Sequence, residues 1–86
     1  MVKVIIKKLN PTVNLPEYKT YGSSGMDLKA FINESINVKP NTSYLVPTGL
    51  FVAFPKDYEI QIRPRSGLAA KENISVLNTP GTIDSD

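Results

Sequence analysis

Hydrophobic residues recur at every second position in several short segments of the chain. The clearest case is residues 58–63, where Tyr58, Ile60 and Ile62 alternate with polar neighbours, and residues 2–7 follow the same period. Successive side chains of a β-strand point to opposite faces, so this alternation predicts half-buried strands. Further short strands are predicted at residues 26–30, 36–38, 43–54, 74–77 and 82–84.

Residues 66–73 differ, because they contain helix formers without an alternating pattern. Leu68, Lys71 and Glu72 flank two alanines and favour one or two helical turns, which Ser66 is predicted to cap. Seven prolines and five glycines separate the segments of the chain. Many short strands, regular turns and one helical turn predict an all-β sandwich, barrel or jelly roll, formed as a single domain over residues 1–86.

The composition restricts the chemistry that the chain can perform. Its 86 residues include no cysteine and no histidine, which excludes disulfides, Cys/His zinc sites and catalytic triads that need histidine. A metal would have to be held by oxygen ligands, which favours magnesium or calcium. Without histidine, a carboxylate is the expected general base.

The charge pattern indicates neither a nucleic-acid nor a membrane partner. Ten basic and eight acidic residues leave a net charge of +2, and no stripe of Lys and Arg interleaves with aromatic residues. The apolar run at the N-terminus is too short for a signal peptide, and no segment approaches transmembrane length. We therefore expect a cytoplasmic protein.

The densest cluster of candidate chemistry is residues 63–67, Arg-Pro-Arg-Ser-Gly. Pro64 ends the predicted strand, so Arg65 projects from a rigid corner. Ser66 and Gly67 then begin the short helix, whose first amides lack helical partners and whose dipole is positive at this end. A guanidinium, a hydroxyl and such amides at one place suit a phosphate chain. An ordinary strand-to-helix turn with a capping serine and a solvated arginine explains the same residues.

Asp27 is a second candidate. It lies between Met26 and Leu28 in a predicted strand, after a loop that contains Gly22 and Gly25. An aspartate is disfavoured in a strand, so this one indicates a metal, a hydrogen-bond network or simply the solvent-exposed face.

The third candidate is the acidic pair Asp84 and Asp86, which follows a turn at Pro80 and Gly81. Residues two apart in a strand share a face, so both carboxylates project the same way. Such a pair can bind a cation or supply a general base. A polar, frayed terminus is the other interpretation.

Taken together and in order, three motifs resemble a known family. SSGMDL (residues 23–28), RPRSGLAAK (63–71) and NTPGTIDSD (78–86) resemble the first three signature motifs of the homotrimeric dUTPases, and residues 46–50, VPTGL, resemble another stretch of that family. The resemblance implies a jelly-roll-like β-barrel that hydrolyses dUTP to dUMP and pyrophosphate with Mg²⁺. This reaction lowers dUTP and supplies dUMP for thymidylate synthesis.

The resemblance also implies a role for each matching residue. Asp84 corresponds to the aspartate that orients and deprotonates the attacking water. Arg65, Ser66 and Gly67 correspond to the phosphate-binding motif, and Asp27 to an aspartate that organises the magnesium ion through water. The hairpin that encloses uracil and deoxyribose corresponds to Asn78, Gly81, Thr82, Ile83 and Asp84.

Other parts of the family pattern are missing from these residues. By the resemblance, an aromatic residue should follow Asp86, and a fourth motif and a glycine-rich, phenylalanine-containing arm should come later. The resemblance therefore implies an N-terminal portion of the domain, which is inactive by itself because each site of the trimer needs those motifs.

Two alternatives stay open from the sequence. A related dCTP deaminase shares the fold, although GTIDSD matches the hydrolase pattern and the residues around Arg65 show no deaminase-type substitution. A non-catalytic, truncated interaction fragment is the other alternative, because an exposed barrel edge favours association.

Overall fold

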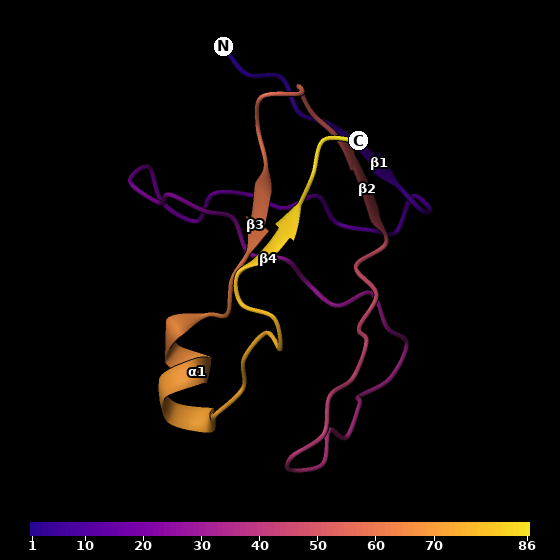
Figure 1. The fold of residues 1–86 in the computed structure, drawn as a ribbon. Helices are drawn as coiled ribbons and strands as arrows, with labels where there is room; N and C mark the ends of the chain where they lie inside the picture. The colour runs from indigo at the N-terminus through magenta and orange to yellow at the C-terminus, as the bar shows by residue number, and fades with distance from the viewer. The chain divides into compact units, whose positions relative to one another are not determined.

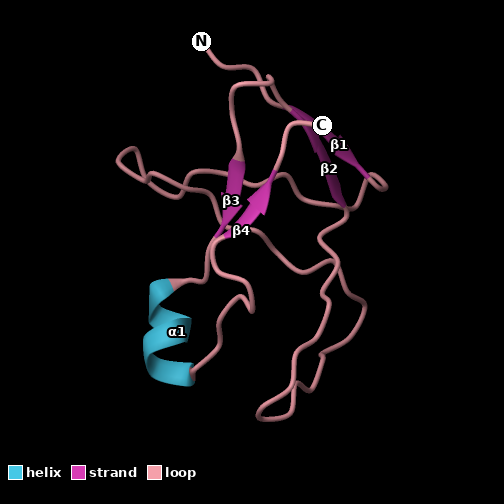
Figure 2. Ribbon diagram, viewed as in Figure 1, coloured by secondary structure: helices cyan, strands magenta, loops and turns pink.

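A computed structural model describes all residues from Met1 to Asp86 (Figure 1). Strands outnumber helices, as Figure 2 shows, and the one helix follows the Arg-Ser-Gly motif. The prediction of a β protein with one short helix at this place is therefore confirmed. The elements are β1 (Ile5–Lys8), β2 (Leu50–Ala53), β3 (Ile60–Ile62), α1 (Ser66–Glu72) and β4 (Gly81–Ile83).

The chain forms two compact units, which are described separately. One unit contains residues 1–5 and 53–86, and the other contains residues 6–52. β1 and β2 pair in one two-stranded sheet, and β3 and β4 pair in another. The second sheet lies wholly in the first unit, together with α1. The single domain over residues 1–86 stays a prediction.

The unit of residues 6–52 is organised around Gly49. The amide of Leu9 donates to the carbonyl oxygen of Gly49 at 2.8 Å, and the amide of Phe31 donates to that of Pro47 at 2.7 Å. Gly49 has a φ of 71°, and a Cβ there would lie 2.8 Å from Val13 Cγ2 and 3.2 Å from the Phe31 ring. Val13 is itself buried, with 3% of its surface exposed. A glycine at this position therefore lets three segments of the chain meet.

β3 and β4 form an antiparallel pair with one apolar and one polar face; residues 63–80, which include α1, connect them, so the pair is a wide hairpin without a tight turn. Its antiparallel register pairs Ile60 with Ile83, Gln61 with Thr82, and Ile62 with Gly81. Paired residues share a face, so Ile60, Ile62 and Gly81 lie on one side, where the isoleucines are half-buried and the glycine is buried. Gln61 and Thr82 lie on the opposite, exposed side. The alternation seen in the sequence therefore becomes a two-sided hairpin.

Several predicted strands are shorter than expected or do not form. β1 begins at Ile5, and only Leu50–Ala53 of residues 43–54 is a strand. Residues 26–30, 36–38 and 74–77 form no strand. An alternating pattern provides two faces but no hydrogen-bonding partner, and a strand needs both. The turn at residues 39–41 does form, with the Thr42 amide donating to the Lys39 carbonyl oxygen at 3.2 Å.

The helix α1 corrects one detail of the sequence prediction. Arg65 is the N-cap residue, and Ser66 is the first helical residue with no side-chain capping hydrogen bond. The predicted serine cap is therefore wrong, because the chain enters the helix one residue earlier than expected. Asn73 ends the helix in the left-handed conformation, with a φ of 56°. No helix combines the length and the apolar character that crossing a membrane requires.

Candidate active site

Asp84 directly follows β4 on the polar face of the hairpin. Residues two apart in a strand share a face, so Asp84 lies on the side of Thr82, and its side chain is exposed. Glu59 directly precedes β3 at the same end of the pair. The carboxylate of Asp84 is therefore accessible to water and to a solute.

Three polar side chains form a hydrogen-bonded ladder along the same face. Arg63 donates from Nε and Nη2 to Gln61 Oε1 at 3.2 and 2.6 Å, and Gln61 Nε2 donates to Glu59 Oε2 at 2.8 Å. Sequence reasoning found the alternation of these residues but missed the ladder. The signal was the spacing of two between a carboxylate, an amide and a guanidinium, which puts all three on one face.

The turn before β4 brings Asn78 against Gly81. The Thr79 amide donates to the Val76 carbonyl oxygen at 3.1 Å and closes the turn. A methyl group on Gly81 would lie 3.4 Å from Asn78 Oδ1, 3.5 Å from Asn78 Nδ2 and 3.6 Å from Ile62 Cβ. The carboxamide of Asn78 therefore covers the buried Gly81. The structure thus gathers Asn78, Gly81, Thr82, Ile83 and Asp84 into one arm of the hairpin.

The outer edge of β4 is a further feature of this arm. β4 pairs with β3 in a sheet of only two strands. In an antiparallel pair, alternate residues of each strand direct their N–H and C=O groups away from the partner. β4 therefore presents backbone donors and acceptors along its outer edge.

Arg65, Ser66 and Gly67 lie together at the start of α1. Arg65 is extended, with φ −71° and ψ 128°, and its carbonyl oxygen accepts the first helical hydrogen bond from the Ala69 amide at 2.9 Å. The amides of Ser66 and Gly67 precede this bond. A Cβ added to Gly67 would meet nothing within 4 Å. Two backbone amides and an open surface at Gly67 are thus available for the close approach of an anion.

The structure does not bring Arg65–Gly67 to Asp84. Asp84 lies beyond the end of the hairpin where β3 begins, and α1 follows the end where β3 finishes. Figure 1 shows α1 beyond one end of the β3–β4 pair and the C-terminus beyond the other. Arg65 comes six positions after Glu59, which precedes β3 at the end of the pair near Asp84. At about 3.3 Å per extended residue this is up to roughly 20 Å.

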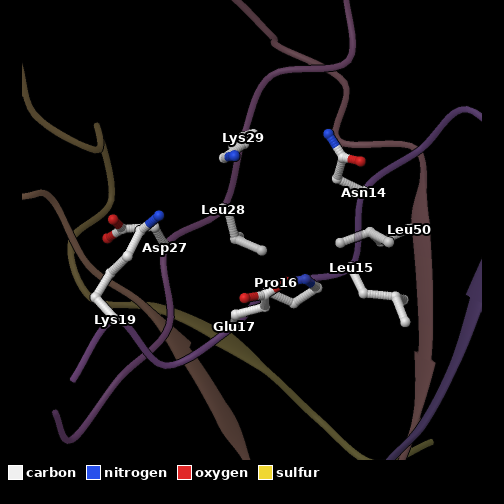
Figure 3. A pocket seen from close by; sticks show the side chains of 9 residues that line it. All are labelled: Asn14, Leu15, Pro16, Glu17, Lys19, Asp27, Leu28, Lys29 and Leu50. Atoms are coloured by element: carbon white, nitrogen blue, oxygen red, sulfur yellow. The ribbon is translucent and has the colours of Figure 1, made fainter.

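Asp27 lies in the other unit, on the wall of a pocket of about 260 Å³. Figure 3 shows Asp27 and Lys19 on one side of this pocket and Asn14 and Leu50 on the other. Asp27 is half-buried, and Glu17 and Lys29 also line the pocket. The lining therefore combines acidic and basic side chains with apolar ones.

The chain does not assemble a metal site from its own acidic side chains. No group of three or more Asp and Glu residues lies close enough together to hold a metal ion. A cation at Asp27 would thus take most of its ligands from water or from a bound solute.

Comparison with known proteins identifies the family. The dUTPase family model matches residues 12–86 of the chain. The chain therefore belongs to the dUTPase family, as its motifs indicated.

The curated relatives carry a more specific name. The chain is 59% identical over 87 residues to a deoxyuridine 5'-triphosphate nucleotidohydrolase of Fusobacterium nucleatum subsp. nucleatum, with 100% of this chain and 60% of that protein covered. It is 58% identical over 82 residues to the protein of that name from Treponema denticola, covering 95% of this chain and 57% of the other. The Finegoldia magna protein is 54% identical over 85 residues, covering 99% and 57%. The chain spans about 60% of the length of these relatives.

Proposed function

We propose that the full-length protein hydrolyses dUTP to dUMP and pyrophosphate, by attack of water on the α-phosphorus. The exposed Asp84 at the end of β4 is the observation that carries this proposal. It follows β4, the strand that the turn of Asn78 precedes, in a chain of the dUTPase family, whose curated relatives are named for this activity.

Asp84 is the proposed general base. It would accept a hydrogen bond from the attacking water, orient it and remove its proton as the bond to phosphorus forms. A carboxylate takes this role because the chain contains no histidine. Phosphoryl chemistry depends mainly on positioning and charge stabilisation, so one such base suffices.

Arg65, Ser66 and Gly67 are the proposed phosphate-binding residues. The guanidinium supplies charge and paired donors, the hydroxyl one donor, and the amides before the first helical bond two more. Their grouping at the start of α1, with open space at Gly67, supports this assignment.

The outer edge of β4 is proposed to read the base. Uracil presents a row of donors and acceptors along one edge, as a neighbouring strand would. Backbone groups from Gly81 to Ile83 can pair with that row, with Asn78 and Thr82 beside it. The backbone of these residues cannot change conformation as a side chain can, so we expect it to exclude the 5-methyl group of thymine by steric overlap.

Magnesium is the proposed cofactor. A single carboxylate at Asp27 fits an ion that keeps several waters and takes its other ligands from substrate phosphates. When bound, the ion would neutralise charge on the triphosphate. Asp27 would then contact the waters of the ion rather than the ion itself.

We further propose that the full-length protein forms a homotrimer of single-domain jelly-roll barrels. Support comes from the position of Arg65–Gly67 and Asp84 at opposite ends of the hairpin, which leaves each group to be completed by other residues. Large hydrophobic side chains such as Leu45 and Leu77 are also exposed by 95% and 87%.

Substrate selection tests the proposed function directly. The full-length protein should release pyrophosphate from dUTP with a kcat/KM at least about 100-fold above that for dTTP or UTP. Pyrophosphate release with each nucleotide measures this. Equal rates for the three nucleotides would overturn the proposal, and release of ammonia from dCTP would indicate a deaminase instead.

Gly67→Ala separates binding from folding. A methyl group at this position meets no atom of the chain, and alanine favours the helix by about 1 kcal/mol, so the thermal unfolding midpoint should stay equal or rise. If the phosphates approach the backbone here, KM for dUTP should rise about tenfold. Unchanged KM would remove Gly67 from the phosphate site.

A further inference from the structure

Ser85 lies between two exposed acidic residues but faces the other way. Asp84 and Asp86 are exposed, whereas Ser85 is half-buried on the side of Ile83. Its hydroxyl donates to the carbonyl oxygen of Lys56 at 3.3 Å. The two residues are 29 positions apart, so this hydrogen bond joins distant parts of the chain.

The acceptor belongs to a turn of defined shape. The Tyr58 amide donates to the Pro55 carbonyl oxygen at 3.1 Å, which closes the turn around Lys56 just before β3. The ring of Pro55 fixes its own φ and stiffens the turn. β3 begins two residues after Tyr58 and pairs there with Ile83, so this turn lies at the end of the pair where Ser85 follows β4.

Asp84 lies between two residues that are held in place. On one side of Asp84, Ile83 pairs with Ile60 as the last pair of the hairpin. On the other side, Ser85 is held to the Lys56 carbonyl oxygen. We propose that Ser85 is a positioning residue, which keeps the carboxylate of Asp84 on the polar face by anchoring the next residue on the apolar face. The inference rests on the proposed role of Asp84 as general base.

A matched pair of variants, Ser85→Thr and Ser85→Val, tests the proposed positioning role of Ser85 in the full-length protein. The two side chains have nearly the same shape and both favour extended backbone, but only threonine keeps the hydroxyl. A net hydrogen bond corresponds to about three- to tenfold in an equilibrium. We expect Ser85→Val to lower kcat for dUTP by that factor with KM unchanged, and Ser85→Thr to retain the original kcat.

Amide hydrogen exchange in the same variants gives a readout that does not depend on catalysis. Exchange at residues 84–86 should accelerate in Ser85→Val but not in Ser85→Thr, with the same thermal unfolding midpoint. Ser75→Ala is the control, because its hydroxyl contacts only the adjacent Val76 carbonyl oxygen. Equal kcat and equal exchange in the valine and threonine variants would overturn the inference. Altered exchange in a protein that does not hydrolyse dUTP would instead refute the proposed function alone.

Discussion

Asp84→Asn is expected to lower kcat for dUTP by about 10³-fold in the full-length protein. The amide has the size of the carboxylate but cannot take the proton of the attacking water. Because Asp84 is exposed and has no side-chain role in the hairpin core, folding and KM should change little. Steady-state kinetics and binding of a non-hydrolysable dUTP analogue measure the two effects separately.

Asp86→Asn is the matched control for this variant. Asp86 is exposed on the same face two residues later, so the substitution removes an equal charge from nearly the same place. Asp86→Asn should lower kcat less than about tenfold, since an exposed charge two residues from the proposed base interacts only weakly through water. If Asp86→Asn abolishes turnover and Asp84→Asn does not, the general base has been assigned to the wrong aspartate.

Gly49→Ala is expected to cause a large loss of stability. Its φ of 71° is strained for alanine, and the new Cβ would lie 2.8 Å from Val13 Cγ2 and 3.2 Å from the Phe31 ring. Backbone strain and overpacking together should lower the free energy of unfolding by about 2 to 4 kcal/mol. Urea denaturation measures this change.

Gly22→Ala provides the comparison for Gly49→Ala. A Cβ at Gly22 meets nothing within 4 Å. Its free energy of unfolding should therefore stay within about 0.5 kcal/mol of the original. A similar loss in both variants would mean that the contact of Gly49 with Val13 and Phe31 does not decide the stability of its unit.

The sequence predicted the strands β3 and β4 from their local patterns, but not their pairing. The turn at residues 78–81 was expected to return the chain onto residues 74–77, whereas β4 pairs with β3, from which residues 63–80 and α1 separate it. The segments at residues 26–30 and 74–77 have a similar composition but no partner strand in the structure. Pairing depends on distant segments, which the period of a segment does not specify.

The candidate site was predicted residue by residue, but not its geometry. Motifs identified Asp84 and Arg65 without indicating that they lie at opposite ends of one hairpin. The hydrogen bond from Ser85 to the Lys56 carbonyl oxygen could not be predicted either, because a serine between two aspartates gives no sign of a distant partner. Both relations follow from register and turn geometry, which a list of residue types does not contain.

The outer edge of β4, the proposed base-reading edge, would also affect solubility. The backbone groups that can pair with a base can also pair with a strand from another molecule, because both partners offer the same row of donors and acceptors. A nucleotide bound at this edge would occupy its backbone donors and acceptors and so block pairing with another strand. Self-association and substrate would then compete for one edge, so the nucleotide would also protect the protein from aggregation.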